Sequence, residues 1–153
     1  RAMMREIARL NREIHALAPL LATACPAALS GSRRDPVVSV QPPWLMARTL
    51  FAGTEAALVI LVNRDHLSDR LGTLFQPVER ARIALRLPPW LADAPAFRLA
   101  EGACAPVALS REGGSATAQL EGIALTEVVL ICRDPSAVQG VRQRWFALAP
   151  AEE

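Results

Sequence analysis

The sequence contains no lysine and no tyrosine, and only 5% of its residues are aromatic. Its net charge of +2 is too small to indicate a nucleic-acid partner by itself. The longest apolar run covers residues 56–62, which is far too short to cross a bilayer. We therefore expect a globular domain that has neither a nucleic acid nor a membrane as its partner.

The cysteines and histidines do not form the spacings of a metal or redox site. Cys25, Cys104 and Cys132 are widely separated and include no CxxC pair, so zinc and thioredoxin-type chemistry are not predicted. Neither His15 nor His66 has a second ligand at metal-binding spacing. We predict no metal and no cofactor, and we expect the cysteines to be buried as small apolar side chains.

The sequence also lacks a recognisable set of catalytic residues. Asp65, His66 and Ser68 lie in one predicted loop, whereas a nucleophilic triad needs side chains that converge from separate elements. Acidic residues are scattered beside turns and strand ends, so no carboxylate pair can be nominated for glycosidase chemistry. Gly113 and Gly114 lack the spacing and the following helix of a phosphate loop. We therefore predict no catalytic residue.

Residues 3–21 have the clearest helical periodicity. Apolar residues recur at two heptad positions and form one stripe: Met3, Leu10 and Leu17 at the first, and Ile7, Ile14 and Leu21 at the second. Glu13 follows Arg9 by four residues on the charged face, which predicts a weak surface ion pair. Pro19 is expected to break or kink the helix. Since the sequence begins at Arg1 with two methionines inside this helix, we expect further residues upstream.

From residue 37 onward the hydrophobic period changes from helical to strand-like. Residues 56–62 are continuously apolar, which predicts a central strand buried on both faces. Arginines alternate with apolar residues over 80–87, which predicts one solvated face. Residues 63–76 are predicted to be a polar loop, and 111–114 a hairpin turn. The remaining predicted strands are 37–40, 44–51, 97–100, 107–109, 115–120 and 127–132.

Short strands with no helices between them predict a mainly β fold, an antiparallel, immunoglobulin-like β-sandwich. Asp134 as N-cap and Pro135 at the first helical position predict a short C-terminal helix, with Val138, Val141 and Trp145 on one face. The predicted organisation is an N-terminal amphipathic helix and connector (1–29), a linker (30–36), the sandwich (37–134), and a C-terminal helix and tail (135–153).

Trp44 and Trp90 each follow a Pro-Pro pair and precede a leucine. Exposed indole rings can stack on sugars, so these two residues are candidates for carbohydrate binding. Large aromatic side chains are more often buried in a core or a domain contact. The two tryptophans therefore either bind carbohydrate or pack in a core or a domain contact.

Three segments resemble parts of some multidomain glycoside hydrolases. Residues 9–21, RLNREIHALAPLL, resemble a helix "LN-x-EI-xx-LAPLL" that leads from a catalytic (β/α)₈ barrel into a β-sandwich. Residues 56–63, AALVILVN, resemble a sandwich strand that ends in Asn, and residues 82–90, RIALRLPPW, resemble a strand followed by "LP-x-W". The resemblance covers roughly residues 5–135 and implies an accessory role. The catalytic carboxylates of that family lie on the barrel, so none is carried over.

Three functions follow as hypotheses. The first is a non-catalytic accessory domain that contacts a catalytic domain of the same polypeptide. The second is an independent carbohydrate-binding module, and the third is a self-associating domain whose partner is a second copy. A small standalone enzyme is least favoured. The helix residues predicted to contact a domain or a partner are Ile7, Leu10, Ile14, Leu17 and Leu21.

Overall fold

The structure is a computed structural model that describes residues 2–28, 34–69, 72–100 and 102–148. Within these residues the chain forms two main antiparallel sheets and a separate two-stranded ribbon, so the predicted mainly β fold is confirmed. Sheet A has, in spatial order, β1 (Ala24–Pro26), β3 (Leu45–Ala52), β4 (Ala56–Asn63), β12 (Thr126–Cys132), β8 (Ala96–Arg98) and β9 (Ala105–Val107). Sheet B has β10 (Ser110–Glu112), β11 (Ser115–Ile123), β7 (Val78–Leu85) and β2 (Val38–Gln41).

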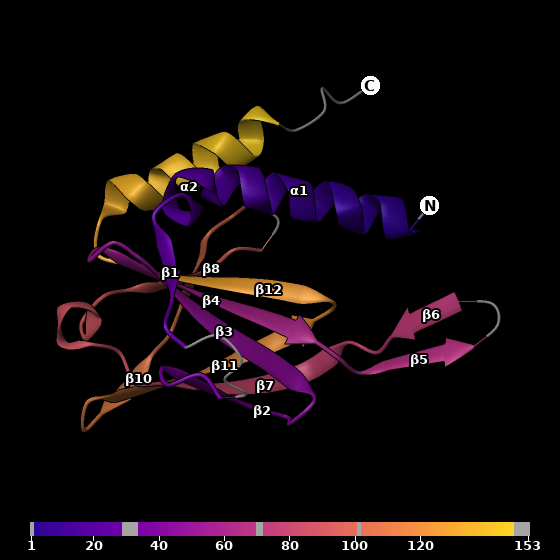
Figure 1. The fold of residues 1–153 in the computed structure, drawn as a ribbon, viewed down its shortest axis with the longest axis horizontal. Helices are drawn as coiled ribbons and strands as arrows, with labels where there is room; N and C mark the ends of the chain where they lie inside the picture. The colour runs from indigo at the N-terminus through magenta and orange to yellow at the C-terminus, as the bar shows by residue number, and fades with distance from the viewer. Residues whose placement is uncertain (1, 29–33, 70–71, 101, 149–153) are drawn as a thin grey trace.

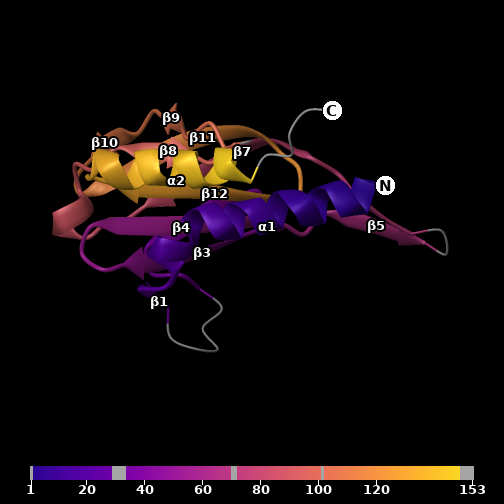
Figure 2. The same cartoon turned by 90° about the horizontal axis from the view of Figure 1, so that it is seen from above.

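Two helices cover the face of sheet A that sheet B leaves open (Figure 1). They are α1 (Ala2–Leu21) and α2 (Pro135–Ala147), which correspond to the predicted N-terminal and C-terminal helices. Seen from above, the helices lie side by side, with α1 over β3 and β4 and α2 toward β8 (Figure 2). The Nε of Arg144 in α2 donates a hydrogen bond of 2.8 Å to the carbonyl oxygen of Ala16 in α1.

The two faces of sheet A belong to two separate cores. Between the sheets lie Val59, Leu61, Ile83, Leu85, Val129 and Ile131, among others. Between sheet A and the helices lie Ala16, Leu17, Leu58, Leu130, Val141 and Trp145, among others. Since β4 and β12 occupy the middle of sheet A, their side chains are buried on both sides, which confirms the predicted central strand.

The solvated face predicted for residues 80–87 is also confirmed, because Arg80, Arg82 and Arg86 are exposed. The predicted hairpin turn is present at Gly113 and Gly114, and both have positive φ angles, as a type I′ turn requires. The predicted N-cap of the C-terminal helix is confirmed, since Oδ1 of Asp134 accepts a hydrogen bond of 2.8 Å from the Ser136 amide.

Some local predictions are wrong. The predicted polar loop 63–76 contains β5 (His66–Asp69) and β6 (Gly72–Phe75), which pair as a ribbon that extends away from the sandwich (Figure 1). A ribbon that extends away from the two sheets does not need alternating apolar residues, so the sequence pattern did not indicate it. The connector contains β1, an edge strand, where Pro26 is tolerated. Helix α1 continues through Pro19 and ends at Leu21, so the helix does not break at Pro19. The predicted strand 107–109 shares only Val107 with β9, and residues 108–109 lie between β9 and β10.

The boundaries of the predicted linker stay a prediction, because residues 29–33 lie outside the described part of the chain. The same holds for the predicted tail beyond residue 148. A short 3₁₀ helix, η1 (Pro89–Leu91), lies between β7 and β8 and contains Trp90.

Gly102 is a point of close contact between the chain after β8 and helix α2. It is buried, has a φ of +77°, and a Cβ built there would lie 2.0 Å from Cδ1 of Trp145. Gly53 has a similar φ of +58°, but a Cβ there would meet nothing within 4 Å. Both glycines therefore need a positive φ angle, but only Gly102 lacks room for a Cβ atom.

We predict that Gly102→Ala lowers the free energy of unfolding by about 3 kcal/mol or more, because strain and overpacking add at this position. Gly53→Ala should cost only about 1 kcal/mol, since backbone strain alone remains. Urea denaturation followed by far-UV circular dichroism measures both. Equal losses in the two variants would contradict the close packing of Trp145 on Gly102.

Candidate functional site

Helix α1 presents charged residues, not its whole apolar stripe, to sheet A. Glu13 is only 3% exposed, although Ile7 and Ile14 are 43% and 57% exposed and Met4 is 68% exposed. Of the predicted contact residues, Leu17 is buried in this domain's own core, and Leu10 and Leu21 are partly buried. We call the exposed residues Met4, Ile7 and Ile14 the apolar row of α1. The side chain of Met3 lies outside the described residues.

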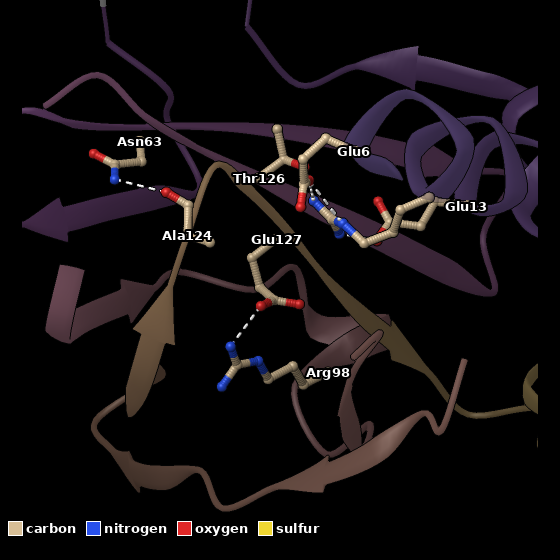
Figure 3. A network of polar contacts seen from close by, with 8 residues as sticks. Glu6, Glu13, Asn63, Arg98, Ala124, Thr126 and Glu127 are labelled. Carbon is tan, nitrogen blue, oxygen red and sulfur yellow. Dashed lines mark hydrogen bonds and ion pairs between the residues drawn. The ribbon is translucent and has the colours of Figure 1, made fainter. Parts of the chain in front are cut away.

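Arg9 joins α1 to the beginning of β12, and Figure 3 labels three residues that it contacts, Glu6, Glu13 and Thr126. Its guanidinium forms an ion pair with Glu6 at 3.1 Å and another with Glu13, and its Nη2 donates a hydrogen bond of 3.0 Å to Oγ1 of Thr126. The predicted Arg9–Glu13 pair is therefore formed, but its prediction as a surface pair is wrong. Because these polar groups bond to each other beneath the helix, they fix the rotation of α1 on the sheet.

Burial raises the pKa of the Glu13 carboxyl to about 7. The nearby Arg9 lowers this pKa, whereas the carboxylates of Glu127 and Glu6 raise it further. A carboxyl group in this position is therefore partly protonated near neutral pH. The charge on the buried face of α1 consequently changes with pH.

A second polar contact lies on the opposite face of β12. Successive side chains of a strand point to opposite faces, so Glu127 faces the core between the sheets, as Val129 does. Nη2 of Arg98 in β8 lies 2.6 Å from Oε2 of Glu127, and its Nη1 donates a hydrogen bond of 2.6 Å to the carbonyl oxygen of Glu121 in β11. Arg98 therefore connects two strands of sheet A to sheet B. Figure 3 shows its contact with Glu127.

Asn63 joins three segments at the end of β4. Its Nδ2 donates hydrogen bonds to the carbonyl oxygens of Gln76 at 2.6 Å and Ala124 at 2.8 Å, and its Oδ1 accepts one from the Asp65 amide at 2.9 Å. The side chain is 1% exposed, and its donor and acceptor groups are both used. The asparagine that ends this strand therefore holds the base of the β5–β6 ribbon against the β11–β12 turn.

The two candidate sugar-binding tryptophans are both about half exposed, with 48% for Trp44 and 47% for Trp90. The Trp90 ring centroid lies 6.3 Å from that of Phe51, near the end of β3, whereas Trp44 precedes the first residue of the same strand. At the usual rise per residue, nearly the whole of β3 places Trp44 and Phe51 about 20 Å apart. The two indoles do not form one platform.

The remaining candidate residues do not assemble into a site. No group of three or more His, Cys, Asp or Glu side chains that could hold a metal ion occurs among the described residues. His66 is exposed in β5, and its ring nitrogen lies 2.9 Å from the carbonyl oxygen of Arg64. The side chain of Ser68 lies outside the described residues, so the relation of Asp65, His66 and Ser68 stays untested. His15 is exposed on α1.

The expected burial of the cysteines is confirmed for Cys104 and Cys132 and is wrong for Cys25, which is exposed in the edge strand β1. Burial raises the pKa of both buried thiols. No helix in the described part of the chain is long and apolar enough to cross a membrane.

No protein-family model matches the sequence, and no curated protein matches it. Among solved structures, the chain is similar to the alpha-L-fucosidase isoenzyme 2 from Paenibacillus thiaminolyticus, with a TM-score of 0.49 and 10% sequence identity. The similarity covers 64% of this chain and 15% of the fucosidase chain. A likeness of this extent establishes neither a family nor a function.

Sequence patterns did not reveal the two buried carboxylates. Glu13 lies on the charged face of the helix, and the spacing of the charged residues does not indicate that this face packs on a sheet. Glu127 did carry a signal, because it is the only charged residue in the otherwise apolar segment 127–132. A charge inside a buried strand needs a partner, and Arg98 supplies it from a strand distant in sequence.

We predict that the contribution of Glu13 to the stability of the protein falls as the pH rises from 4.5 to 7. The folded protein binds the Glu13 proton more tightly than the unfolded chain, since its pKa is raised from 4.5 to about 7. The Glu13 carboxyl therefore contributes most to the free energy of unfolding below pH 4.5. This contribution of about 3 kcal/mol is lost once the pH has passed 7. Urea denaturation at several pH values measures the fall.

The variant Glu13→Gln should remove this part of the pH dependence, because an amide does not titrate. Glu6→Gln is the matched control, since it removes a more exposed carboxylate that binds the same arginine. It should retain the fall seen in the wild type. A Glu13→Gln protein with the wild-type pH dependence would refute the assignment.

We predict that Arg98→Met lowers the free energy of unfolding by about 3 kcal/mol at pH 7, because it leaves the buried Glu127 carboxylate unpaired. The double variant Arg98→Met with Glu127→Met should recover most of this loss, since no buried charge remains. The measurement is chemical denaturation of both variants. If the double variant is as unstable as the single one, the loss comes from packing and not from the unpaired charge.

Proposed function

We propose that this chain is a non-catalytic accessory β-sandwich domain of a glycoside-hydrolase-like protein, and that the apolar row of α1 contacts the catalytic barrel of that protein. The observation that carries the proposal is the exposure of this row on a helix whose opposite face is fixed to the sandwich. The barrel is a proposal that rests on the resemblance of the sequence to such enzymes.

The row is a rigid surface. Leu17 and Ala16 hold the C-terminal half of α1 in the core with α2, and Arg9 holds the N-terminal half at Thr126. The helix therefore cannot turn its isoleucines inward without breaking the ion pairs of Arg9. Burying one isoleucine side chain fully is worth about 2 kcal/mol, so a partner that covers the row gains several kcal/mol.

The order of the elements supports the same proposal. The segment 9–21 that resembles the inter-domain helix lies in α1, and the chain then enters the sandwich. The segment 56–63 is β4, and its terminal Asn63 has a specific bonding role. The segment 82–90 runs from β7 into η1. A helix that precedes a sandwich is the arrangement that the resemblance implies.

The other two functions remain as alternatives. A second copy of the chain would cover the same apolar row, so self-association competes directly with the barrel contact. A carbohydrate-binding module would use Trp44 or Trp90 separately, because the two rings lie at opposite ends of β3. The exposed row has no role in that function, and this favours the accessory domain.

Methionine oxidation distinguishes these functions. Met4 and Met46 are both exposed in this chain, and only Met4 belongs to the row. We predict that in the protein made from the complete reading frame, peroxide oxidises Met4 about tenfold more slowly than in the isolated chain, because oxidation follows exposure. Met46 should react at the same rate in both, and mass spectrometry measures both rates.

The outcomes separate the alternatives. Equal rates for Met4 in the two proteins would contradict a contact with a catalytic domain. Protection of Met4 in the isolated chain that disappears on dilution would indicate a second copy instead. The coding sequence upstream of Arg1 gives an independent test, since a reading frame that begins at Met3 or Met4 would leave no barrel for the helix to contact.

A further inference from the structure

One side of the sandwich is closed and the opposite side is open. On the closed side, β2 of sheet B lies next to β3 of sheet A. On the open side, residues of β9 in sheet A and of β11 in sheet B line a groove of about 730 Å³, and Ser110 of β10 borders it. These three strands lie along one side of the domain in Figure 2. The groove therefore gives access to the edge of a sheet.

The edge of β11 along this groove is unpaired. In the described residues, β10 pairs with Ser115–Thr117 and extends no further, whereas β7 pairs along the other side of β11. Backbone groups that point to one side of a strand recur at every second residue. Those of Gln119 and Glu121 therefore point to the same side as those of Thr117, which β10 pairs. This side is the groove.

Arg98 covers one end of this edge. Its Nη1 donates a hydrogen bond of 2.6 Å to the carbonyl oxygen of Glu121, which confirms that the carbonyl points away from β7. The amide and carbonyl groups of Gln119 and the amide group of Glu121 remain available beside it. Open backbone donors and acceptors at a strand edge are the groups that bind an added strand.

The groove has an apolar wall and a polar wall. Ala118 and Leu120 point into the core between the sheets, and they line the groove together with Val107. Gln119 points to the opposite face of sheet B, where it lies beside Arg82, its neighbour in β7. Arg82 is exposed and lines the groove, and its guanidinium forms no hydrogen bond or ion pair with another described residue.

The two walls fit an extended peptide with an acidic side chain. Successive side chains of a strand point to opposite faces, so its apolar residues would lie against Leu120 and its polar residues beside Gln119. A carboxylate beside Gln119 would form a charge-assisted contact with Arg82. The edge of a second folded copy is less suitable, because residues 105–108 border the groove and leave room for one strand without a sheet behind it.

We propose that an extended acidic segment of a partner protein binds in this groove as an added strand of sheet B. The segment forms main-chain hydrogen bonds with Gln119 and Glu121 and places a carboxylate at Arg82. This site goes beyond the proposed accessory role and does not depend on it, because none of the residues that line the groove belongs to α1.

Amide hydrogen exchange of the chain tests the open edge directly. The amides of Gln119 and Glu121 should exchange about tenfold faster or more than those of Ala118 and Leu120, which point to β7. Equal protection of all four amides would show that the edge is covered, and it would overturn the proposal.

The binding test uses the acetylated and amidated peptide Thr-Val-Glu-Val-Thr, followed by NMR of the backbone amides. Binding that shifts the amides of Gln119 and Glu121 supports the proposal, and no shift of either amide at millimolar peptide overturns it. Shifts of the same amides when the chain is concentrated without peptide would indicate a second copy as the occupant instead, and would also overturn it.

N-methylated peptides separate strand addition from other binding. Methylation of the glutamate nitrogen removes the hydrogen bond to the carbonyl oxygen of Gln119 and should weaken binding about tenfold or more. Methylation of the first valine nitrogen is the control, because that group points away from β11 in the same register. Equal losses with the two peptides would contradict an added strand.

Matched variants test the charge. Arg82→Gln should weaken binding about fivefold, because one charge-assisted contact is lost. Arg80→Gln removes the same charge from an exposed residue of β7 that does not line the groove, and it should bind as the wild type does. Equal losses in the two variants overturn the role of Arg82. Thermal unfolding verifies that each variant is folded.

Discussion

The central strands of sheet A are apolar on both faces, and the rest of the structure depends on covering them. Sheet B covers one face of β4 and β12, and the two helices cover the other. The chain therefore cannot be a simple two-sheet sandwich with an appended helix. Helix α1 belongs to the core of the domain through Ala16 and Leu17, and Trp145 of α2 closes the same layer against Gly102.

How α1 covers the sheet decides which of its residues remain available. The ion pairs of Arg9 with Glu6 and Glu13, and its bond to Thr126, place charge between the helix and β12. Because a helix can bury only one face, the apolar row of Met4, Ile7 and Ile14 is left outside. A buried ionisable group thus links the stability of the domain to pH and, through the rotation of α1, determines its outward surface.

The outward surface that results is apolar and rigid. It suits a large protein surface, such as the barrel that we propose.

Local sequence patterns were enough to predict the mainly β fold, the two terminal helices, the central strand and the cap at Asp134. Hydrophobic periodicity over a few residues predicts the helices and strands, and the capping preference of Asp predicts the start of the C-terminal helix. The sequence also located the apolar stripe of α1, but it left open whether Trp44 and Trp90 are exposed. The sequence did not predict β5 and β6. Because this ribbon extends away from the two sheets, its sequence needs no alternation of apolar and polar residues.

The neighbours of these elements could not be predicted from local patterns, because they depend on how the whole chain packs. The pairing of Glu127 with Arg98 and the contact of Arg9 with Thr126, beside the buried Glu13, join residues that are distant in sequence. Local patterns fix which residues share a face of a helix or strand. They do not fix which face lies on the neighbouring element, because that depends on packing and on partners contributed by other strands.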